Sequence, residues 1–334
     1  MRSLKLHSAG KLDLEANAAL PIRPGYQLWR VSHVGICKTD YHLFRHPKAL
    51  HVTLGHEVVV ESEGKPLVLN NEVACGQCSY CLEGMPRHCA ALHELGVNAD
   101  GGYADFIAAP RSHLFPIEVE DPATAVLVEP LACAIHCAER INAALALLPP
   151  DVSRYRILLI GAGISGRLVA FALQRLELDL ELSIHDQDPH TAMLARTGYL
   201  TPRSRIDTEE YHLVVECSGS NDGLATAISS CRRGGVVVMY GMPDEQASLP
   251  CPALTLFSKE LTLLPSMAGC NPQTMGTAIA YLQEEEPFFH TLLGKRIGLE
   301  QAAHEIAGGT PLPGTRTLVA MHSQEEPADA ATLL

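Results

Sequence analysis

Apolar and polar positions alternate differently in two parts of the chain. Residues 1–130 contain short runs suited to β-strands, separated by Gly, Pro and Asn: LWRVSHVG (28–35), HEVVVES (56–62) and YADFIAAP (103–110). This pattern predicts an irregular, largely β domain with long loops. A helix is predicted next, over PLACAIHCAERINAALALL (130–148), because Pro130 suits a first turn and Pro149 and Pro150 follow the end.

From residue 151 the pattern changes to strands that alternate with helices. The predicted strands are nearly continuous apolar runs: RILLI (156–160), DLELSIHD (179–186), YHLVVECSG (211–219) and GGVVVMYG (234–241). Such runs are typical of a parallel sheet covered on both faces. GTRTLVAMH (314–322) resembles a closing strand. The expected fold class is therefore α/β, with a β-rich domain (1–130 and 273–334) interrupted by a doubly wound domain (131–272).

Composition narrows the class of protein. Hydrophobic residues make up 47% and charged residues 19%, as in globular proteins, and the net charge is −13. That charge argues against a nucleic-acid partner and against an anionic membrane surface. The N-terminus has no apolar core of a signal peptide, and no apolar run approaches the roughly 20 residues that span a bilayer. Eleven cysteines without an export signal predict a cytoplasmic protein whose clustered cysteines bind metal.

Three glycines mark a candidate nucleotide site. Gly161, Gly163 and Gly166 form G-x-G-x-x-G directly after a predicted strand and at the start of a helix. These glycines allow a tight turn, approach of a pyrophosphate and close helix–strand packing, and the helix N-terminus attracts phosphate. Asp186 ends the next apolar strand, where a carboxylate binds ribose hydroxyls and repels a 2′-phosphate. NAD is therefore favoured over NADP, with Asp188 as an alternative to Asp186.

Four cysteines lie close together in CGQCSYCLEGMPRHC (75–89). Cys75, Cys78, Cys81 and Cys89 have the spacing C-x2-C-x2-C-x7-C. A ferredoxin run would have three residues before its fourth cysteine and Pro after it, so that assignment fails. Four thiolates on a short loop can enclose a tetrahedral Zn²⁺ with no open position, which predicts a structural site. Disulfides are disfavoured because a reducing compartment keeps thiols reduced. Free thiols without a metal are disfavoured because four cysteines lie so close together.

A second set of possible ligands is dispersed. GICKTDYH contains Cys37, LGHEVVV contains His56 and Glu57, and VLVEPLAC contains Glu129. Cysteine, histidine and carboxylate are typical ligands of a catalytic zinc with one open position. Each residue alone is weak evidence, since an isolated cysteine is usually a core residue and GHE is also found in turns. Their order along the chain carries the prediction.

These segments together resemble the zinc-dependent alcohol dehydrogenases of the medium-chain dehydrogenase/reductase family. The resemblance is carried by GICKTDYH, GHE, the cysteine lobe, DGGYADFI, VEPLA, GAGISG, ECSG, RRGG and KELTL. It implies a split GroES-like catalytic domain around a Rossmann domain, with substrate and zinc in the cleft between them. It also implies a homodimer or homotetramer. VEPL, with Glu rather than Cys, is similar to the polyol and threonine dehydrogenase branch.

The same resemblance implies two zinc ions per chain. The catalytic ion would be held by Cys37 and His56 with one or both of Glu57 and Glu129, and water or alcohol would complete its coordination. The structural ion would be held by the four cysteines of the lobe. The catalytic zinc would lower the pKa of a bound alcohol, whose alkoxide would expel hydride to NAD.

Further residues receive roles from the resemblance. Thr39 would accept the substrate hydroxyl proton, His42 would pass it to solvent, and Asp40 would orient the imidazole of His56. The residues expected at the cofactor are Lys38, Gly161, Gly163, Ile164, Gly166, Asp186, Cys217 and Gly241.

The sequence departs from the family pattern in two places. Val60 replaces the glycine of GHE-x-x-G, and GKPLVLNNEVACGQC shortens the link into the cysteine lobe. The late loop PSMAGCNPQTM lacks the aromatic and basic residues of a sorbitol-type pocket. The expected reaction is hydride transfer between NAD(H) and a secondary alcohol or ketone: a polyol, cyclitol, amino-cyclitol or hydroxy-amino acid. The alternatives are a dehydrogenase of simple primary alcohols and a non-catalytic scaffold with this fold.

Overall fold

The computed structural model describes residues 1–7, 11–16, 20, 22–46, 51–149, 152–195, 197–309 and 314–321. The chain divides into two compact units. Unit 1 comprises Met1–Glu129, Ile279–Leu312 and Arg316–Leu334, and unit 2 comprises Pro130–Ala278 and Pro313–Thr315. The acidic end of the sequence, SQEEPADAATLL, lies outside the described residues.

Unit 1 is built on mostly antiparallel sheets, in which β17 and β18 form a parallel pair. Its largest sheet has the strand order β10-β6-β5-β3-β18-β17, with β9 also paired to β3. These strands are β3 (Tyr26–Gly35), β5 (Glu57–Ser62), β6 (Lys65–Leu69), β9 (Phe106–Pro110), β10 (Leu114–Pro116), β17 (Leu293–Gly298) and β18 (Arg316–Ala320). A second sheet, β2-β1-β4, contains β1 (Ser3–His7), β2 (Lys11–Glu15) and β4 (Val52–Thr53). Val60, where the family pattern has glycine, is fully buried in β5 and pairs with Val31 and Leu67.

Short elements of unit 1 carry the candidate ligands. Helix α1 (Lys38–Arg45) follows β3 directly. The shortened link runs from β6 into the two-stranded sheet of β7 (Glu72–Val73) and β8 (His93–Glu94). Between those strands lie α2 (Ser79–Leu82) and a 3₁₀ turn, Pro86–His88. Helices α9 (Glu286–His290) and α10 (Leu299–Gly308) also belong to this unit.

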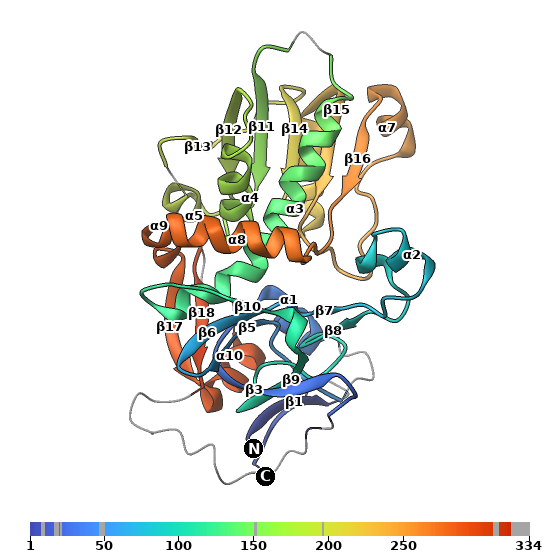
Figure 1. The fold of residues 1–334 in the computed structure, drawn as a ribbon. Coiled ribbons are helices and arrows are strands. Elements are labelled where there is room, and N and C mark those ends of the chain that lie inside the picture. Colours follow the sequence, from blue (N-terminus) through green and yellow to red (C-terminus); the bar gives the residue numbers. More distant parts are fainter. Residues whose placement is uncertain are drawn as a thin grey trace. The chain divides into compact units, whose positions relative to one another are not determined.

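Unit 2 contains a six-stranded, entirely parallel sheet in the order β13-β12-β11-β14-β15-β16 (Figure 1). The strands are β11 (Tyr155–Ile160), β12 (Leu180–His185), β13 (Leu200–Pro202), β14 (Tyr211–Glu216), β15 (Cys231–Met239) and β16 (Thr262–Pro265). The helices are α4 (Ile164–Gln174), α5 (Pro189–Leu194), α6 (Asn221–Ser230) and α7 (Ala253–Lys259). The strand order runs outward in both directions from β11 and β14, so right-handed crossovers place helices on both faces. The predicted α/β fold class with a doubly wound sheet is confirmed.

Helix α3 begins earlier and ends earlier than the sequence predicts. It spans Val128–Leu145 and follows a 3₁₀ segment, Pro122–Leu127. Pro130 is therefore the third residue of the helix, still within the first turn, where its missing N–H costs no hydrogen bond. Helix α8 (Pro272–Glu284) begins with a proline for the same reason. No helix among the described residues is both long enough and apolar enough to cross a bilayer.

Candidate metal and nucleotide sites

The four cysteines of the lobe converge. Their sulfur atoms all lie within 4.8 Å of one another, with Sγ–Sγ distances of 3.5 Å for Cys78–Cys81 and 3.9 Å for Cys75–Cys81. Zn–S bonds of about 2.3 Å in a tetrahedron place sulfurs about 3.8 Å apart, so the cluster fits one Zn²⁺. Hydrogen bonds from the backbone of Gln77 and Cys78 lower the pKa of Cys75 to about 6, which favours the metal-binding thiolate.

A second group of possible ligands lies in the interior of unit 1. Cys37, His56 and Glu57 present ligand atoms within 4.8 Å of one another, and His56 and Glu57 are buried. Cys37 precedes helix α1, whereas Glu57 is the first residue of β5, which pairs with the end of β3. This pairing brings together side chains twenty residues apart in the sequence. Thiolate, imidazole and carboxylate suit Zn²⁺, so the donor set fits the metal that the sequence predicts.

The negative charges of this group are only partly compensated without a metal cation. Burial raises the pKa of Cys37, but the charges of Arg316 and His56 outweigh that effect and lower the pKa to about 6. Burial raises the pKa of Glu57 well above its usual range. The Nδ1 atom of His56 is buried without a hydrogen-bond partner. A buried cation beside the thiolate and carboxylate would stabilise the charged forms of both.

Asp40 and Tyr103 support the group from within α1 and the 101–105 turn. One carboxylate oxygen of Asp40 accepts hydrogen bonds from the Cys37 N–H (2.8 Å) and the Tyr103 hydroxyl (2.9 Å). The other lies 3.8 Å from Nδ1 of His56. The Tyr103 hydroxyl is also 3.2 Å from the Gly35 carbonyl oxygen. Asp40 therefore links the backbone of Cys37 to the Tyr103 hydroxyl and lies beside the imidazole of His56. Tyr103 is a contact that the sequence analysis missed.

Arg316 is a second residue that the sequence analysis missed. Its guanidinium lies 2.8 Å from a Glu57 carboxylate oxygen and donates to the Ile36 carbonyl oxygen at 3.0 Å. Both side chains of the pair are almost completely buried. The available signal was an arginine directly before the apolar run TLVA. An arginine at the start of a buried strand is itself expected to be buried, and a buried guanidinium needs a carboxylate partner.

The other predicted residues of the reaction centre lie on α1 and α3. Thr39 Oγ1 is 3.6 Å from the Cys37 sulfur, and His42 is one helical turn further along α1. Lys38, the first residue of α1, is exposed. Glu129 is buried in the first turn of α3. Burial lowers the pKa of His56, but the charge of Cys37, with smaller contributions from Asp40 and Glu129, raises it well above its usual range. Among the described residues, Glu129 lies outside the group of Cys37, His56 and Glu57, and its carboxylate is instead within 4.8 Å of the sulfurs of Cys133 and Cys270.

The glycine motif in unit 2 has the geometry of a nucleotide turn. Gly161 follows β11 with φ +99°, and Gly163 precedes the first residue of α4, Ile164. A Cβ on Gly166 would lie 2.0 Å from the Gly161 carbonyl oxygen, so only glycine allows this close packing. The motif also follows one of the two strands where the sheet order reverses, the usual position of nucleotides in such sheets.

Asp186 is held beside this turn. Its carboxylate accepts a hydrogen bond from the Ala162 N–H at 2.8 Å and another from the Asp188 N–H at 3.0 Å. Asp188 instead caps helix α5, with its carboxylate bound to the N–H groups of His190 and Thr191 and to the Thr191 hydroxyl. The geometry therefore favours Asp186 over the alternative Asp188 for binding a ribose.

Cys217 and Gly241 follow the neighbouring strands β14 and β15. Cys217 is buried, and a Cβ on Gly241 would lie 2.2 Å from the Gly219 N–H nitrogen. The sequence analysis did not single out Glu216, the last residue of β14. Its buried carboxylate accepts hydrogen bonds from the backbone of Ser218 and Gly219 and thereby holds the loop at this edge of the sheet.

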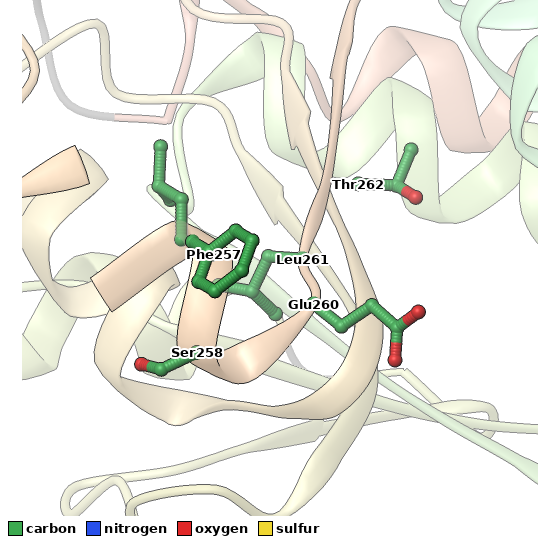
Figure 2. A pocket seen from close by; sticks show the side chains of 6 residues that line it. Phe257, Ser258, Glu260, Leu261 and Thr262 are labelled. Atoms are coloured by element: carbon green, nitrogen blue, oxygen red, sulfur yellow. The ribbon is translucent and has the colours of Figure 1, made fainter. Parts of the chain in front are cut away.

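A surface hollow in unit 2 is lined by other residues. It lies between α7 and the start of β16, and its lining consists of Leu256, Phe257, Ser258, Glu260, Leu261 and Thr262 (Figure 2). Phe257 is 84% exposed. This hollow contains none of the predicted site residues, and it has no cluster of convergent polar groups typical of an active site.

Comparison with known proteins identifies the family of the chain. Residues 23–119 match the alcohol dehydrogenase GroES-like domain, and residues 170–284 match the zinc-binding dehydrogenase domain. The chain therefore belongs to the zinc-dependent alcohol dehydrogenases of the medium-chain dehydrogenase/reductase family, as its sequence motifs indicate. It is accordingly an oxidoreductase of the zinc type.

Individual relatives are distant. The chain is 28% identical to D-arabinitol dehydrogenase 1 of Uromyces fabae over 77% of this chain and 78% of the relative. It is 24% identical to D-altritol 5-dehydrogenase of Agrobacterium fabrum over 90% of this chain and 94% of the relative. Galactitol-1-phosphate dehydrogenase from Escherichia coli has the same fold, with a TM-score of 0.80, 19% identity, and coverage of 96% and 100%.

Proposed function

We propose that this protein is an NAD-dependent dehydrogenase that interconverts a secondary alcohol and its ketone on a polyol or sugar-acid substrate. The buried group of Cys37, His56 and Glu57 carries the proposal. These residues would hold a catalytic Zn²⁺, and the four-cysteine lobe would hold a structural one. When bound, the catalytic zinc supplies Lewis acidity that lowers the pKa of a coordinated alcohol. NAD supplies the hydride acceptor.

The chain itself would position the substrate and move its proton. Thr39 Oγ1 lies beside the Cys37 sulfur, so its hydroxyl can accept the proton of an alcohol placed at this group. His42 follows at i+3 on the same side of α1 and would pass that proton onward. Asp40 would orient the His56 ring from its position 3.8 Å from Nδ1, while Arg316 compensates the charge of Glu57. Glu129 is a further candidate ligand, supplied by α3.

The preference for NAD rests on Asp186. Its carboxylate is held at the glycine turn by the Ala162 N–H, where it would accept hydrogen bonds from the ribose hydroxyls. A 2′-phosphate at this position would be repelled by the carboxylate. Lys38, Ile164, Cys217 and Gly241 are proposed to contact the cofactor as well.

The substrate class rests on the relatives. Several act on sugar alcohols or sugar acids by name, including D-arabinitol, D-altritol and L-galactonate dehydrogenases, and others are L-threonine 3-dehydrogenases. The decisive experiment is a substrate panel followed by NADH absorbance: pentitols and hexitols, cyclitols, aldonates, L-threonine, and simple primary alcohols. Fast turnover of primary alcohols alone would refute the polyol assignment.

The metal group is tested by Cys37→Ala. This variant should lose turnover while binding NAD as the wild type does, because the nucleotide turn lies in the other unit. Cys251→Ala, which removes a partly exposed cysteine of unit 2, is the matched control and should retain both properties. Full activity of Cys37→Ala would exclude Cys37 from the reaction centre.

A further inference from the structure

Two cysteines of unit 2 face each other beside Glu129, a candidate zinc ligand: the three side chains present ligand atoms within 4.8 Å of one another. The sulfur atoms of Cys133 and Cys270 lie 3.8 Å apart, although the residues are 137 positions apart in the chain. Cys133 is on helix α3, and Cys270 is in the segment 266–271 between β16 and α8. Cys133 is partly exposed, whereas Cys270 is buried.

The segment that carries Cys270 is fixed on both sides. The Ser266 N–H donates to the Met239 carbonyl at 2.9 Å, and the Thr274 hydroxyl donates to the Gly269 carbonyl at 2.6 Å. Gly269 has φ +140°, and a Cβ there would lie 2.4 Å from Cβ of His136 on α3. Only glycine permits this contact, so the approach of the segment to α3 is built into the fold.

We propose that Cys133 and Cys270 are a modification site: a thiol pair that a peroxide converts reversibly into a disulfide. A disulfide has an S–S distance of about 2.05 Å, so the sulfurs must approach by roughly 1.8 Å. We expect rotation about the Cα–Cβ bonds, together with a small shift of the segment or of α3, to bring the sulfurs together. This chemistry lies beyond the proposed dehydrogenase activity, although the carboxylate of Glu129, a candidate ligand of the proposed catalytic zinc, lies within 4.8 Å of both sulfurs.

The oxidation occurs in two balanced steps. Cys133, the more accessible of the two, attacks a peroxide oxygen as the thiolate. The O–O bond breaks, one oxygen leaves as water, and Cys133 becomes a sulfenic acid. The Cys270 sulfur then attacks the Cys133 sulfur, the S–O bond breaks, and a second water leaves with the Cys270 proton. One peroxide is thus reduced to two waters as two thiols become one disulfide, and a dithiol reverses the reaction.

Oxidation at this position should affect turnover because of where α3 begins. Cys133 is four residues after Glu129, so the two side chains lie on the same side of the helix, one turn apart. A shift of α3 at Cys133 would displace Glu129, a candidate ligand. Displacements of about 1 Å near reacting groups can reduce rates by two orders of magnitude.

Peptide mapping of the zinc-loaded protein tests the disulfide directly. After hydrogen peroxide treatment and alkylation, non-reducing tryptic digestion should link peptide 112–140, which contains Cys133, to peptide 260–295, which contains Cys270. Cys137 shares the first peptide, so the mapping is repeated in Cys137→Ala. Dithiothreitol should abolish the linkage. Absence of this linkage, at peroxide concentrations that oxidise other thiols of the chain, would overturn the proposal. The mapping requires no turnover, so its result tests the disulfide whether or not the proposed dehydrogenase activity is correct.

Activity before and after peroxide provides a second readout. The wild type and the control Cys251→Ser should lose on the order of tenfold in rate, reversibly, because the disulfide moves α3. Cys133→Ser and Cys270→Ser should each keep their own untreated rate. Equal losses in all four proteins would assign the inactivation to oxidation of the zinc-binding cysteines and refute a regulatory effect of the pair. Either serine variant alone suffices if the other fails to fold.

Discussion

The buried ion pair of Arg316 and Glu57 offers the sharpest test of how the interior of unit 1 is stabilised. Arg316→Met removes the guanidinium while keeping an apolar side chain of similar length. Glu57 is then left fully buried beside Cys37, without the cation 2.8 Å from its carboxylate. Loss of one partner of a buried pair typically costs about 3–5 kcal/mol of unfolding free energy, so a loss of this size is expected.

A matched surface pair defines the control. Lys11 and Asp13 lie 2.7 Å apart in the same unit, but their side chains are 70% and 39% exposed. Lys11→Met should therefore change the unfolding free energy by no more than about 1 kcal/mol. The double variant Arg316→Met/Glu57→Gln should recover much of the loss, because it removes the unpaired carboxylate as well as the guanidinium.

The assay uses the single tryptophan of the chain. Trp29 lies in β3, whose last residue pairs with Glu57, so its fluorescence during urea unfolding reports on unit 1. All variants are measured at the same free zinc concentration, since metal binding adds to apparent stability. If Arg316→Met unfolds at the urea concentration of Lys11→Met, the buried pair has no stabilising role and the reasoning is wrong.

Three further predictions concern the metals and the nucleotide turn. Metal analysis should find two zinc ions per chain in the wild type. Cys78→Ser should contain one zinc ion per chain, bound at the Cys37 group. A wild-type protein with at most one zinc ion per chain would contradict the two-site interpretation. Asp186→Ala should weaken NAD binding roughly 10- to 100-fold, from the loss of charged hydrogen bonds to ribose, and NADP binding much less. Asp179→Ala, at the other end of β12, is its control, and equal losses for both cofactors would show that Asp186 does not contact the ribose. Gly166→Ala should destabilise unit 2 by about 1–3 kcal/mol, because its Cβ would meet the Gly161 carbonyl oxygen at 2.0 Å. Gly163→Ala, with no atom within 4 Å of its Cβ, should leave the thermal midpoint unchanged, and similar midpoints for the two variants would contradict the packing argument.

The local sequence pattern was sufficient to predict the parallel sheet, the glycine turn and the cysteine lobe. Apolar strands separated by helices specified a parallel sheet, and the glycine turn could be placed between β11 and α4, because these signals depend on neighbouring residues. The cysteine lobe was likewise readable, since four thiols within fifteen residues can reach one ion without help from the rest of the chain. The family motifs then indicated Cys37 and His56, with one or both of Glu57 and Glu129, as a group.

Tertiary structure decided what those residues touch. Pairing of β5 with β3 brings Glu57 beside Cys37, and only the antiparallel pairing of β18 with β3 brings Arg316 to Glu57, 259 positions away. Tyr103 and the Cys133–Cys270 pair were equally invisible, because their contacts cross 63 and 137 positions of sequence. Periodicity reports which face of an element is buried, but not which distant side chain it meets, because that depends on strand order and register. The sequence therefore named the chemistry, and the fold supplied the charges and contacts that would hold it in place.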